Sequence, residues 1–394
     1  MTVEVRPLGV ACNIACQYCY QNPQRDAGNV PGRYDLDAIL ASLDSERQPF
    51  ALFGGEPLLV PIPDLERLWA YGLERFETNR IQTNGALITD EHIALFLAYK
   101  VRVGVSIDGP DELNDARWAG SLERTRAQTA RSEAAIDKMC AAGVPTSLII
   151  TLHRANASAE RLPRLVEWVR GLDARGILGA RLHLLEVDSP EVGEKYRLTA
   201  AENVAVLEAF EALDGEVRMG LDVFSDMKRM MEGRDDKASC VWRACDPYTT
   251  AAVRSVEGSG QMSNCGRTNK DGVDFVKGDR PGYERYLALY HTPQQHGGCK
   301  DCRFFLVCKG YCPGTSLDGD WRNRTEHCDT WKSLYGTLER RMQKEGRHPL
   351  TLSGLRPDLE RRMLEAWARG RNPTLYEQLH RMKRELDGLL EEAP

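Results

Sequence analysis

Short apolar stretches alternate with segments of helical periodicity over the first half of the chain. Six of these stretches are predicted to be strands, at residues 2–8, 49–53, 80–82, 102–107, 145–152 and 181–186. Apolar residues at three- and four-residue spacing predict helices between them, at about residues 35–45, 63–75, 124–142 and 159–172. Repeated strand–helix units imply a parallel sheet with right-handed crossovers. The expected fold class is α/β, and six such units fit a partial, TIM-like (β/α)6 barrel.

This alternation fades after about residue 214. Charge density rises through residues 215–236, a cysteine-rich segment follows over residues 237–335, and residues 336–394 are charged and helical in pattern. We therefore expect a barrel at 1–214, a bridging region at 215–236, a small cysteine-rich domain at 237–335 and a C-terminal helical extension at 336–394. The C-terminal helices carry apolar faces that are expected to dock on the body of the protein, with peptide binding as the alternative.

The overall composition excludes several classes of partner. The chain has 394 residues, of which 42% are hydrophobic, and a net charge of −6. This charge gives no electrostatic attraction to nucleic acid or to an anionic membrane surface. There is no apolar run long enough to span a bilayer and no signal-peptide pattern at the start, so a cytoplasmic protein is expected.

Twelve cysteines are present. In an intracellular chain of this size they indicate metal or redox roles rather than disulfides. Eight of them lie between Cys240 and Cys328. The isolated Cys140, on the predicted helix at 124–142, is expected to be a small buried hydrophobic residue.

The first cysteines form a C-x3-C-x2-C pattern at Cys12, Cys16 and Cys19, with Tyr18 just before the last. Three thiolates on one short loop can hold three irons of a [4Fe-4S] cube and leave the fourth iron without a protein ligand. Zinc is the structural alternative, but it takes four protein ligands, and no fourth cysteine or histidine lies nearby in sequence. The pattern therefore favours an iron–sulfur cluster with one open iron.

This motif resembles the signature of the radical S-adenosylmethionine (SAM) superfamily, which is C-x3-C-x2-C with an aromatic residue before the third cysteine. The resemblance implies that SAM chelates the open iron and that an electron from the cluster cleaves it to a 5′-deoxyadenosyl radical, which abstracts hydrogen from a substrate. It also implies a partial barrel, whose active site is formed by the loops after the strands. A reductant such as flavodoxin or ferredoxin is expected to supply the electron.

The residues that the resemblance assigns to SAM all follow predicted strands. The backbone of Gly54, Gly55, Glu56 and Pro57 is expected to contact the amino group of SAM, and Thr83 and Asn84 are expected to contribute to the same binding site. Ser106 and Asp108 are expected near the ribose and carboxylate of SAM, with Arg117 as a partner of the carboxylate. Leu185 is expected beside the adenine. Each has a structural alternative, such as a strand-to-helix turn, an aspartate that bonds its own backbone, or a buried strand end. Two departures from the family pattern concern the same segment: Arg117 is one residue closer to Ser106 than in related enzymes, and Asn114 replaces a frequent histidine.

The later cysteines resemble a SPASM domain, the extension that carries two auxiliary [4Fe-4S] clusters in radical SAM enzymes that modify peptides and proteins. The resemblance implies a first cluster on Cys240, Cys245, Cys265 and Cys312, and a second on Cys299, Cys302, Cys308 and Cys328. Two zinc ribbons are the structural alternative. With the SAM-binding cluster this gives three [4Fe-4S] clusters, and the two with full ligand sets are expected to conduct electrons rather than bind substrate.

Three functions are compatible with these motifs. The leading hypothesis is a maturase that acts on a ribosomally made precursor peptide and forms a thioether or carbon–carbon crosslink. The first strand is predicted at residue 2, so no N-terminal leader-binding domain is expected, and either a separate protein or the barrel mouth and C-terminal helices would recognise the leader.

An anaerobic sulfatase-maturating enzyme, which forms formylglycine, is the second hypothesis. In the sulfatase-maturase pattern, the cysteine after G-x4 is followed by an aspartate that is the proposed general base, whereas Gly266 follows Cys265 here. A non-catalytic iron–sulfur electron carrier is the third, but it does not account for the loops after the strands. Glu186 and Asp188, at the mouth of the predicted barrel, are candidate general bases, with solvated carboxylates as the alternative.

Overall fold

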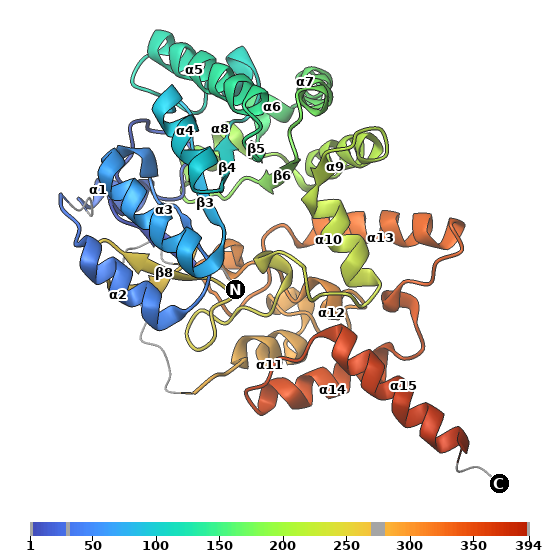
Figure 1. Cartoon of the computed structure of the whole chain (residues 1–394). Helices are drawn as coiled ribbons and strands as arrows, with labels where there is room; N and C mark the ends of the chain where they lie inside the picture. Colours follow the sequence, from blue (N-terminus) through green and yellow to red (C-terminus); the bar gives the residue numbers. More distant parts are fainter. Residues whose placement is uncertain (1–2, 29–31, 269–279, 392–394) are drawn as a thin grey trace. The chain divides into compact units, whose positions relative to one another are not determined.

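The computed structural model describes residues 3–28, 32–268 and 280–391 (Figure 1). It divides into unit 1, made of Met1–Asp222 and Val253–Asp274, and unit 2, made of Val223–Ala252 and Phe275–Pro394. These cuts differ from the predicted divisions, because Val253–Asp274 was expected within the cysteine-rich domain. Thr2, where the first strand was predicted to begin, and residues 269–279 and 392–394 of the two last predicted segments lie outside the described residues.

Unit 1 is built on one open sheet. Its first six strands are β1 (Val3–Arg6), β2 (Phe50–Leu52), β3 (Asn79–Thr83), β4 (Val101–Ser106), β5 (Thr146–Leu152) and β6 (Gly179–Leu184). They lie side by side in chain order and all pair in parallel. The predicted α/β fold with a partial barrel is therefore confirmed.

Three further strands extend this sheet and were missed from the sequence. β7 (Gly220–Leu221) pairs in parallel with β6, β8 (Arg254–Glu257) pairs in parallel with β1, and β9 (Met262–Asn264) pairs antiparallel with β8. They have two to four residues each, which is too short for an alternating pattern to stand out. Through β8 and β9 the segment before Cys265 becomes part of the barrel sheet.

Helices connect the strands and, in Figure 1, α3, α4, α5 and α7 lie along the outside of the sheet. The helices of unit 1 are α1 (Asn22–Asp26), α2 (Leu36–Glu46), α3 (Ile62–Phe76), α4 (Asp90–Ala98), α5 (Leu122–Ala141), α6 (Arg154–Ala157), α7 (Leu162–Ala174), α8 (Pro190–Tyr196) and α9 (Ala200–Asp214). Several begin at a side-chain cap: Asp35, Thr89 and Ser121 each accept a hydrogen bond from a backbone N–H of the first turn. Cys140 on α5 is half-buried rather than fully buried as expected.

Unit 2 contains α10 (Asp222–Met231), α11 (Glu284–His291), α12 (Phe305–Cys308), α13 (Cys328–Lys344), α14 (Arg356–Ala368) and α15 (Leu375–Glu391). Its interior is aromatic, with the buried Trp242 in edge contact with Trp331 and Tyr335. The C-terminal helices dock within this unit as expected, since α14 packs on α11 and Trp367 lies 5.2 Å from Tyr286 between ring centroids. None of the helices in the described part of the chain is both long and apolar enough to cross a bilayer.

Candidate active site and cysteine centres

The loop after β1 carries Cys12, Cys16 and Cys19. Backbone hydrogen bonds hold it to the segment after β4, from Ala15 N to Trp118 O (2.7 Å) and from Gln17 N to Ala116 O (2.9 Å). Burial, opposed by Arg117 and aided by the neighbouring Cys19 and Cys12, raises the pKa of Cys16 to about 12. The three cysteines therefore lie near enough to affect one another's charge, and their thiols lose their protons when they bind metal.

Two glycines after β2 pack directly on this loop. Gly55 N donates to Gly9 O (2.9 Å), and Glu56 N donates to Ala11 O (2.8 Å). A Cβ atom at Gly55 would lie only 1.9 Å from Ala11 O. Glycine is thus required here because the two backbones approach so closely.

The Glu56 side chain is buried and points into the protein. Its carboxylate accepts hydrogen bonds from Leu58 N (3.0 Å), Thr83 Oγ1 (2.7 Å) and Asn84 N (2.8 Å). Burial raises the pKa of Glu56 in spite of these donors. Asn84 in turn donates to Asn13 Oδ1 (2.7 Å) in the cysteine loop. These side chains support the loop, and the expected contacts of residues 54–57, Thr83 and Asn84 with SAM stay predictions.

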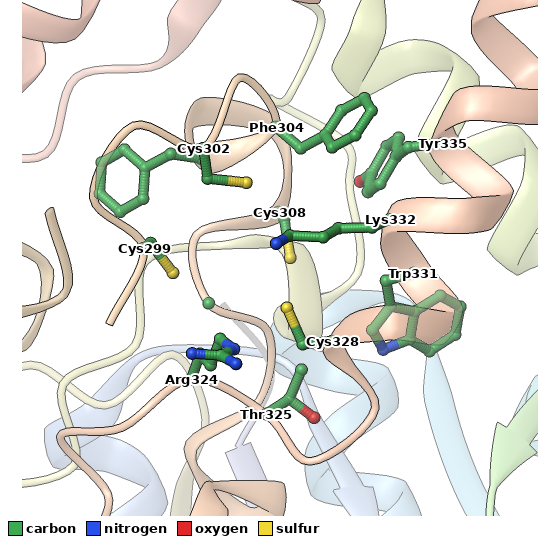
Figure 2. A pocket seen from close by; sticks show the side chains of 12 residues that line it. Cys299, Cys302, Phe304, Cys308, Arg324, Thr325, Cys328, Trp331, Lys332 and Tyr335 are labelled. Atoms are coloured by element: carbon green, nitrogen blue, oxygen red, sulfur yellow. The ribbon is translucent and has the colours of Figure 1, made fainter. Parts of the chain in front are cut away.

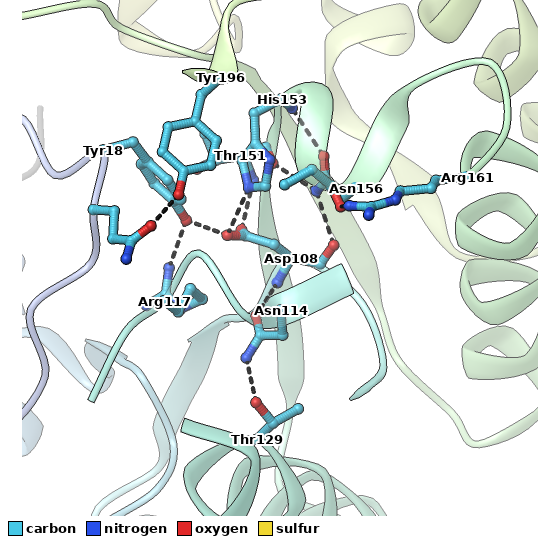
Figure 3. A network of polar contacts seen from close by, with 12 residues as sticks. Tyr18, Asp108, Asn114, Arg117, Thr129, Thr151, His153, Asn156, Arg161 and Tyr196 are labelled. Atoms are coloured by element: carbon cyan, nitrogen blue, oxygen red, sulfur yellow. Dashed lines mark hydrogen bonds and ion pairs between the residues drawn. The ribbon is translucent and has the colours of Figure 1, made fainter. Parts of the chain in front are cut away.

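A polar network joins the cysteine loop to the ends of β4 and β5 (Figure 3). Tyr18 donates its hydroxyl hydrogen to the Asp108 carboxylate. Arg117 NH1 donates to the Tyr18 hydroxyl (3.3 Å), and Thr151 N donates to Asp108 Oδ1 (3.0 Å). His153 Nε2 lies 3.4 Å from Asp108 Oδ2. The aromatic residue of the cysteine motif is therefore tied to a buried carboxylate that follows β4.

Charge within this network is set by burial and by neighbouring groups. Burial alone would raise the pKa of Asp108, but the hydrogen bond with His153, the Arg117 charge and the Tyr18 donor bring it below its usual value. Burial and the Asp108 charge raise the pKa of Tyr18 well above the ordinary range. Asp108 is thus an anion and Tyr18 a neutral donor at physiological pH.

His153 and Asn114 belong to this network and were not predicted as site residues. His153 follows β5 and is completely buried. Asn114, noted only as a departure from the family pattern, accepts from Asp108 N (2.8 Å) and donates to Thr129 Oγ1 (2.8 Å). Position immediately after a strand was the signal that could have identified His153.

Ser106 is the last residue of β4, and Leu185 directly follows β6, which lies two strands away in the sheet. Ser106 Oγ accepts a hydrogen bond from Gln82 Nε2 (2.8 Å). Leu185 packs in a buried cluster with Tyr18, Ala116 and Tyr196. Their expected contacts with SAM, and that of Arg117, stay predictions.

The two candidate bases have different surroundings. Glu186 is 6% exposed and accepts a hydrogen bond from Arg267, which comes two residues after Cys265. Asp188 is half-exposed and lines an open pocket together with Glu194 and Arg197. Arg267 was not predicted, because nothing in the local sequence places it beside a carboxylate 81 residues away.

In unit 2, Cys299, Cys302, Cys308 and Cys328 line one small cavity of about 20 Å³ (Figure 2). The four labelled sulfurs in the figure point towards a common space. Burial raises the pKa of Cys299 to about 12, and Cys302 and Cys328 add to the effect. A four-thiolate set of this kind fits a [4Fe-4S] cluster.

A second group in unit 2 consists of Cys240, Cys245 and Cys312. Burial raises the pKa of Cys245 to about 12, with a further contribution from Cys312 and Cys240. Cys265, the fourth predicted ligand, follows β9 in unit 1, so the complete ligand set stays a prediction. In the described part of the chain, no three His, Cys, Asp or Glu side chains are arranged to hold a single metal ion.

Residues 7–166 match the family model of the radical SAM superfamily. This segment runs from the end of β1 into α7 and includes the cysteine loop and the Asp108 network. Residues 7–166 are therefore a radical SAM domain.

Curated relatives are sulfatase-maturating enzymes. The chain is 36% identical over 128 residues to the serine-type anaerobic sulfatase-maturating enzyme of Bacteroides thetaiotaomicron, which covers 29% of this chain and 30% of that protein. It is 28% identical over 378 residues to the cysteine-type enzyme of Clostridium novyi, covering 85% of this chain and 94% of that protein. The chain spans only 30 to 50% of the length of the first three such relatives.

Solved structures share the fold at low sequence identity. The sulfatase-maturating enzyme anSMEcpe, solved with AdoMet and the Cp18Cys peptide, matches with a TM-score of 0.66 and 17% identity over 87% of this chain and 98% of that one. Streptococcus suis SuiB, solved with its precursor peptide SuiA, matches with a TM-score of 0.52 and 14% identity over 83% and 75%. Both likenesses extend well beyond the radical SAM domain.

Proposed function

We propose that this chain is a radical SAM maturase with a SPASM-type domain, and that it modifies a ribosomally made peptide by forming a thioether or carbon–carbon crosslink. Three [4Fe-4S] clusters serve this reaction: one on Cys12, Cys16 and Cys19, and two auxiliary clusters on the later cysteines. When bound, the first cluster and SAM supply the 5′-deoxyadenosyl radical that removes a hydrogen atom from the substrate.

The observation that carries the proposal is the buried link between the cysteine motif and the strand ends. Tyr18, Asp108 and Arg117 join the loop to the segment after β4. A structural zinc loop or an electron carrier needs no such connection to the mouth of a barrel. A radical enzyme does, because its cofactor must be held in a fixed position relative to the substrate.

The residues around the loop have separable roles in this proposal. Asp108 fixes Tyr18 and, through it, Arg117, whose guanidinium is the expected partner of the SAM carboxylate. Gly54 and Gly55 allow the backbone after β2 to approach the loop and offer its carbonyls to the SAM amino group. Leu185, in its apolar cluster with Tyr18, provides a dry surface for the adenine.

Relatives support a peptide as the substrate class. SuiB was solved with the precursor peptide SuiA, and anSMEcpe with the Cp18Cys peptide. A leader-recognition protein and a small electron donor such as flavodoxin or ferredoxin are the further partners that we propose, together with a cytoplasmic location.

Formation of formylglycine in a sulfatase is the second candidate, favoured by the relative that aligns over 94% of its length. The residue after Cys265 argues against it. In the sulfatase-maturase pattern an aspartate base follows this cysteine, whereas Gly266 stands here. A Cβ atom at Gly266 would lie 3.0 Å from Arg6 NH1 and 3.3 Å from Gln21 Nε2, so the site is packed around a glycine.

Anaerobic incubation of the reconstituted enzyme tests the proposal. The enzyme, SAM and a reductant are combined either with a short peptide encoded beside the gene or with a sulfatase peptide that contains serine or cysteine. A crosslink appears as the loss of two hydrogens in a product that resists fragmentation between the joined residues and does not react with a hydrazide. One 5′-deoxyadenosine is expected for each crosslink, because one hydrogen leaves as the atom that the radical abstracts, the other leaves as a proton, and the remaining electron passes to an auxiliary cluster.

The possible outcomes separate the candidates. A hydrazide-reactive aldehyde in the sulfatase peptide would establish the second candidate and overturn the first. If the cluster-loaded protein fails to cleave SAM with a strong reductant, both candidate functions are contradicted. The remaining hypothesis is then a non-catalytic electron carrier.

A further inference from the structure

Arg285, in α11, is a fully buried guanidinium in unit 2 that the proposed reaction does not use. Each of its contacts is with a neutral oxygen. The acceptors are the backbone carbonyls of Trp321 (2.6 Å), Tyr311 (3.2 Å), Asn323 (3.2 Å), Lys309 (3.4 Å) and Gly310 (3.4 Å), and the Tyr286 hydroxyl (3.3 Å). Among the described residues, none of these partners carries a negative charge.

Such a charge normally requires compensation, because transferring an unpaired guanidinium from water into a protein interior is strongly unfavourable. Another buried cation of the same unit follows this rule: Lys309 Nζ lies 3.1 Å from Asp235 Oδ2. The Asp246 carboxylate accepts hydrogen bonds from the Arg285 backbone N–H (3.2 Å) and from Tyr248 N (3.1 Å), and none of its hydrogen bonds in the described part of the chain comes from the guanidinium. The guanidinium charge is therefore left for another partner.

Hydrogen bonds connect this charge to both cysteine groups of unit 2. The Tyr286 hydroxyl, which accepts from Arg285 NH1, also accepts from Cys245 N and donates to Cys245 O (2.9 Å), in the first group. The carbonyls that it binds belong to the turn between Cys308 and Cys312 and to residues 321–323, shortly before Cys328. One side chain thus touches the backbone that carries ligands of each group.

We infer that Arg285 is the shared counter-charge of the two auxiliary clusters, holding their cysteine loops together and raising the reduction potential of both. This inference rests on the proposed presence of those clusters. An iron–sulfur cluster with four thiolate ligands is an anion, and reduction by one electron makes it more negative. A fixed positive charge in a medium of low dielectric constant stabilises the reduced form more than the oxidised form.

Arg303 provides a matched control. It directly follows Cys302 and is also a cation beside a cysteine ligand, but its side chain is half-exposed and paired with Glu339 at 2.8 and 3.2 Å. Solvent and this carboxylate screen its charge. Replacing Arg303 therefore removes a nearby cation without removing a buried, uncompensated one.

The experiment is a redox titration of the full chain, followed by electron paramagnetic resonance. The triple variant Cys12→Ala, Cys16→Ala and Cys19→Ala serves as background, so that only the auxiliary clusters contribute to the signal. Arg285→Gln is expected to lower both auxiliary potentials, so that at a fixed ambient potential the ratio of reduced to oxidised cluster falls about tenfold, or about 59 mV for a one-electron couple. Arg285→Lys should shift them less, and Arg303→Gln should leave them close to the background values.

The iron content separates failure of this inference from failure of the cluster assignment. If the background protein binds far fewer than about eight irons, the proposed auxiliary clusters are wrong. If it binds them and Arg285→Gln titrates at unchanged potentials, the role given to Arg285 is wrong. If Arg285→Gln loses its clusters, Arg285→Lys decides: retained iron with potentials near the background supports a charge role, and equal loss shows that Arg285 acts through its hydrogen bonds alone.

Discussion

The cysteine loops of the two units are supported by different kinds of groups. In unit 1 the loop with Cys12, Cys16 and Cys19 rests on buried carboxylates, since Glu56 and Asp108 accept hydrogen bonds from the surrounding chain. In unit 2 the cysteine loops rest on an aromatic core and on a buried guanidinium that binds their carbonyls. The first loop is therefore held by carboxylates together with arginines, since Arg117 bonds Tyr18 and Arg25 NH2 donates to Cys19 Sγ (2.8 Å). The buried guanidinium of unit 2 has no carboxylate among its described hydrogen-bond partners.

The proposed function gives a reason for this difference. In the proposal, the first cluster keeps one iron open for SAM, and Tyr18 and the glycines after β2 hold its loop. The auxiliary clusters of the proposal need no open iron, and the four cysteines of the second group line one pocket. The comparison predicts that substitutions near the first loop change SAM binding, whereas those in unit 2 change electron transfer and stability.

Removing one cysteine from each unit should have the largest effects on iron content and SAM cleavage. Cys16→Ala is expected to abolish SAM cleavage and to remove about four of about twelve irons while leaving the auxiliary signals intact. Cys308→Ala should remove a similar amount of iron but retain SAM binding. Iron analysis and SAM cleavage assays measure both, and loss of all iron from either variant would show that the centres do not assemble independently.

Buried tryptophans test whether the units are stabilised separately. Trp242 in unit 2 and Trp69 in unit 1 are both almost completely buried. Replacing either by alanine should lower the free energy of unfolding by about 3 to 5 kcal/mol, because each leaves a large cavity. Denaturant unfolding with local probes in both units is the measurement. Equal loss in both units from one substitution would contradict separate cores.

Substituting Asp108 by asparagine should reveal the anionic support of the first loop. We expect a loss of about 1 to 3 kcal/mol of stability, because buried donors lose a charged acceptor, together with weaker SAM binding as Tyr18 and Arg117 shift. Equilibrium binding and urea unfolding measure the two effects. Unchanged SAM affinity would show that the network is not needed to position the site.

The pH dependence of this variant has a definite sign. Because the pKa of Asp108 is lowered in the folded protein, its contribution to stability is fully present above the unfolded value of about 3.9 and is lost as pH falls through the folded value. The stability difference between Asp108→Asn and the parent should therefore be constant from about pH 8 to about pH 5 and shrink below about pH 4. A difference that grows in acid would contradict an ionised Asp108.

The exposed pair Arg67–Asp37 provides the smallest expected effect. Its atoms lie 2.8 Å apart, but both side chains are more than half exposed. Arg67→Ala should change the unfolding free energy by no more than about 1 kcal/mol, since solvent screens the pair. A larger change would show that the surface of unit 1 stabilises it as much as its buried network does.

The sequence alone was sufficient for the six strands of the barrel, for helices α2, α3, α5 and α7 between them, and for recognising the cysteine motif. These features are local: a strand needs only alternating or apolar residues over a few positions, and the motif needs only its spacing. The grouping of Cys299, Cys302, Cys308 and Cys328 also came from the resemblance in their spacing, and the structure places the four around one pocket.

Only the tertiary structure decided which distant residues meet. His153 and Tyr18 join Asp108 from positions 45 and 90 residues away, Arg267 reaches Glu186, and Arg285 lies buried among carbonyls of the cysteine loops. β8 and β9 join the barrel sheet by pairing that no local pattern signals. The physical reason is that burial, hydrogen bonding and charge compensation depend on neighbours in space, whereas periodicity and spacing record only neighbours along the chain.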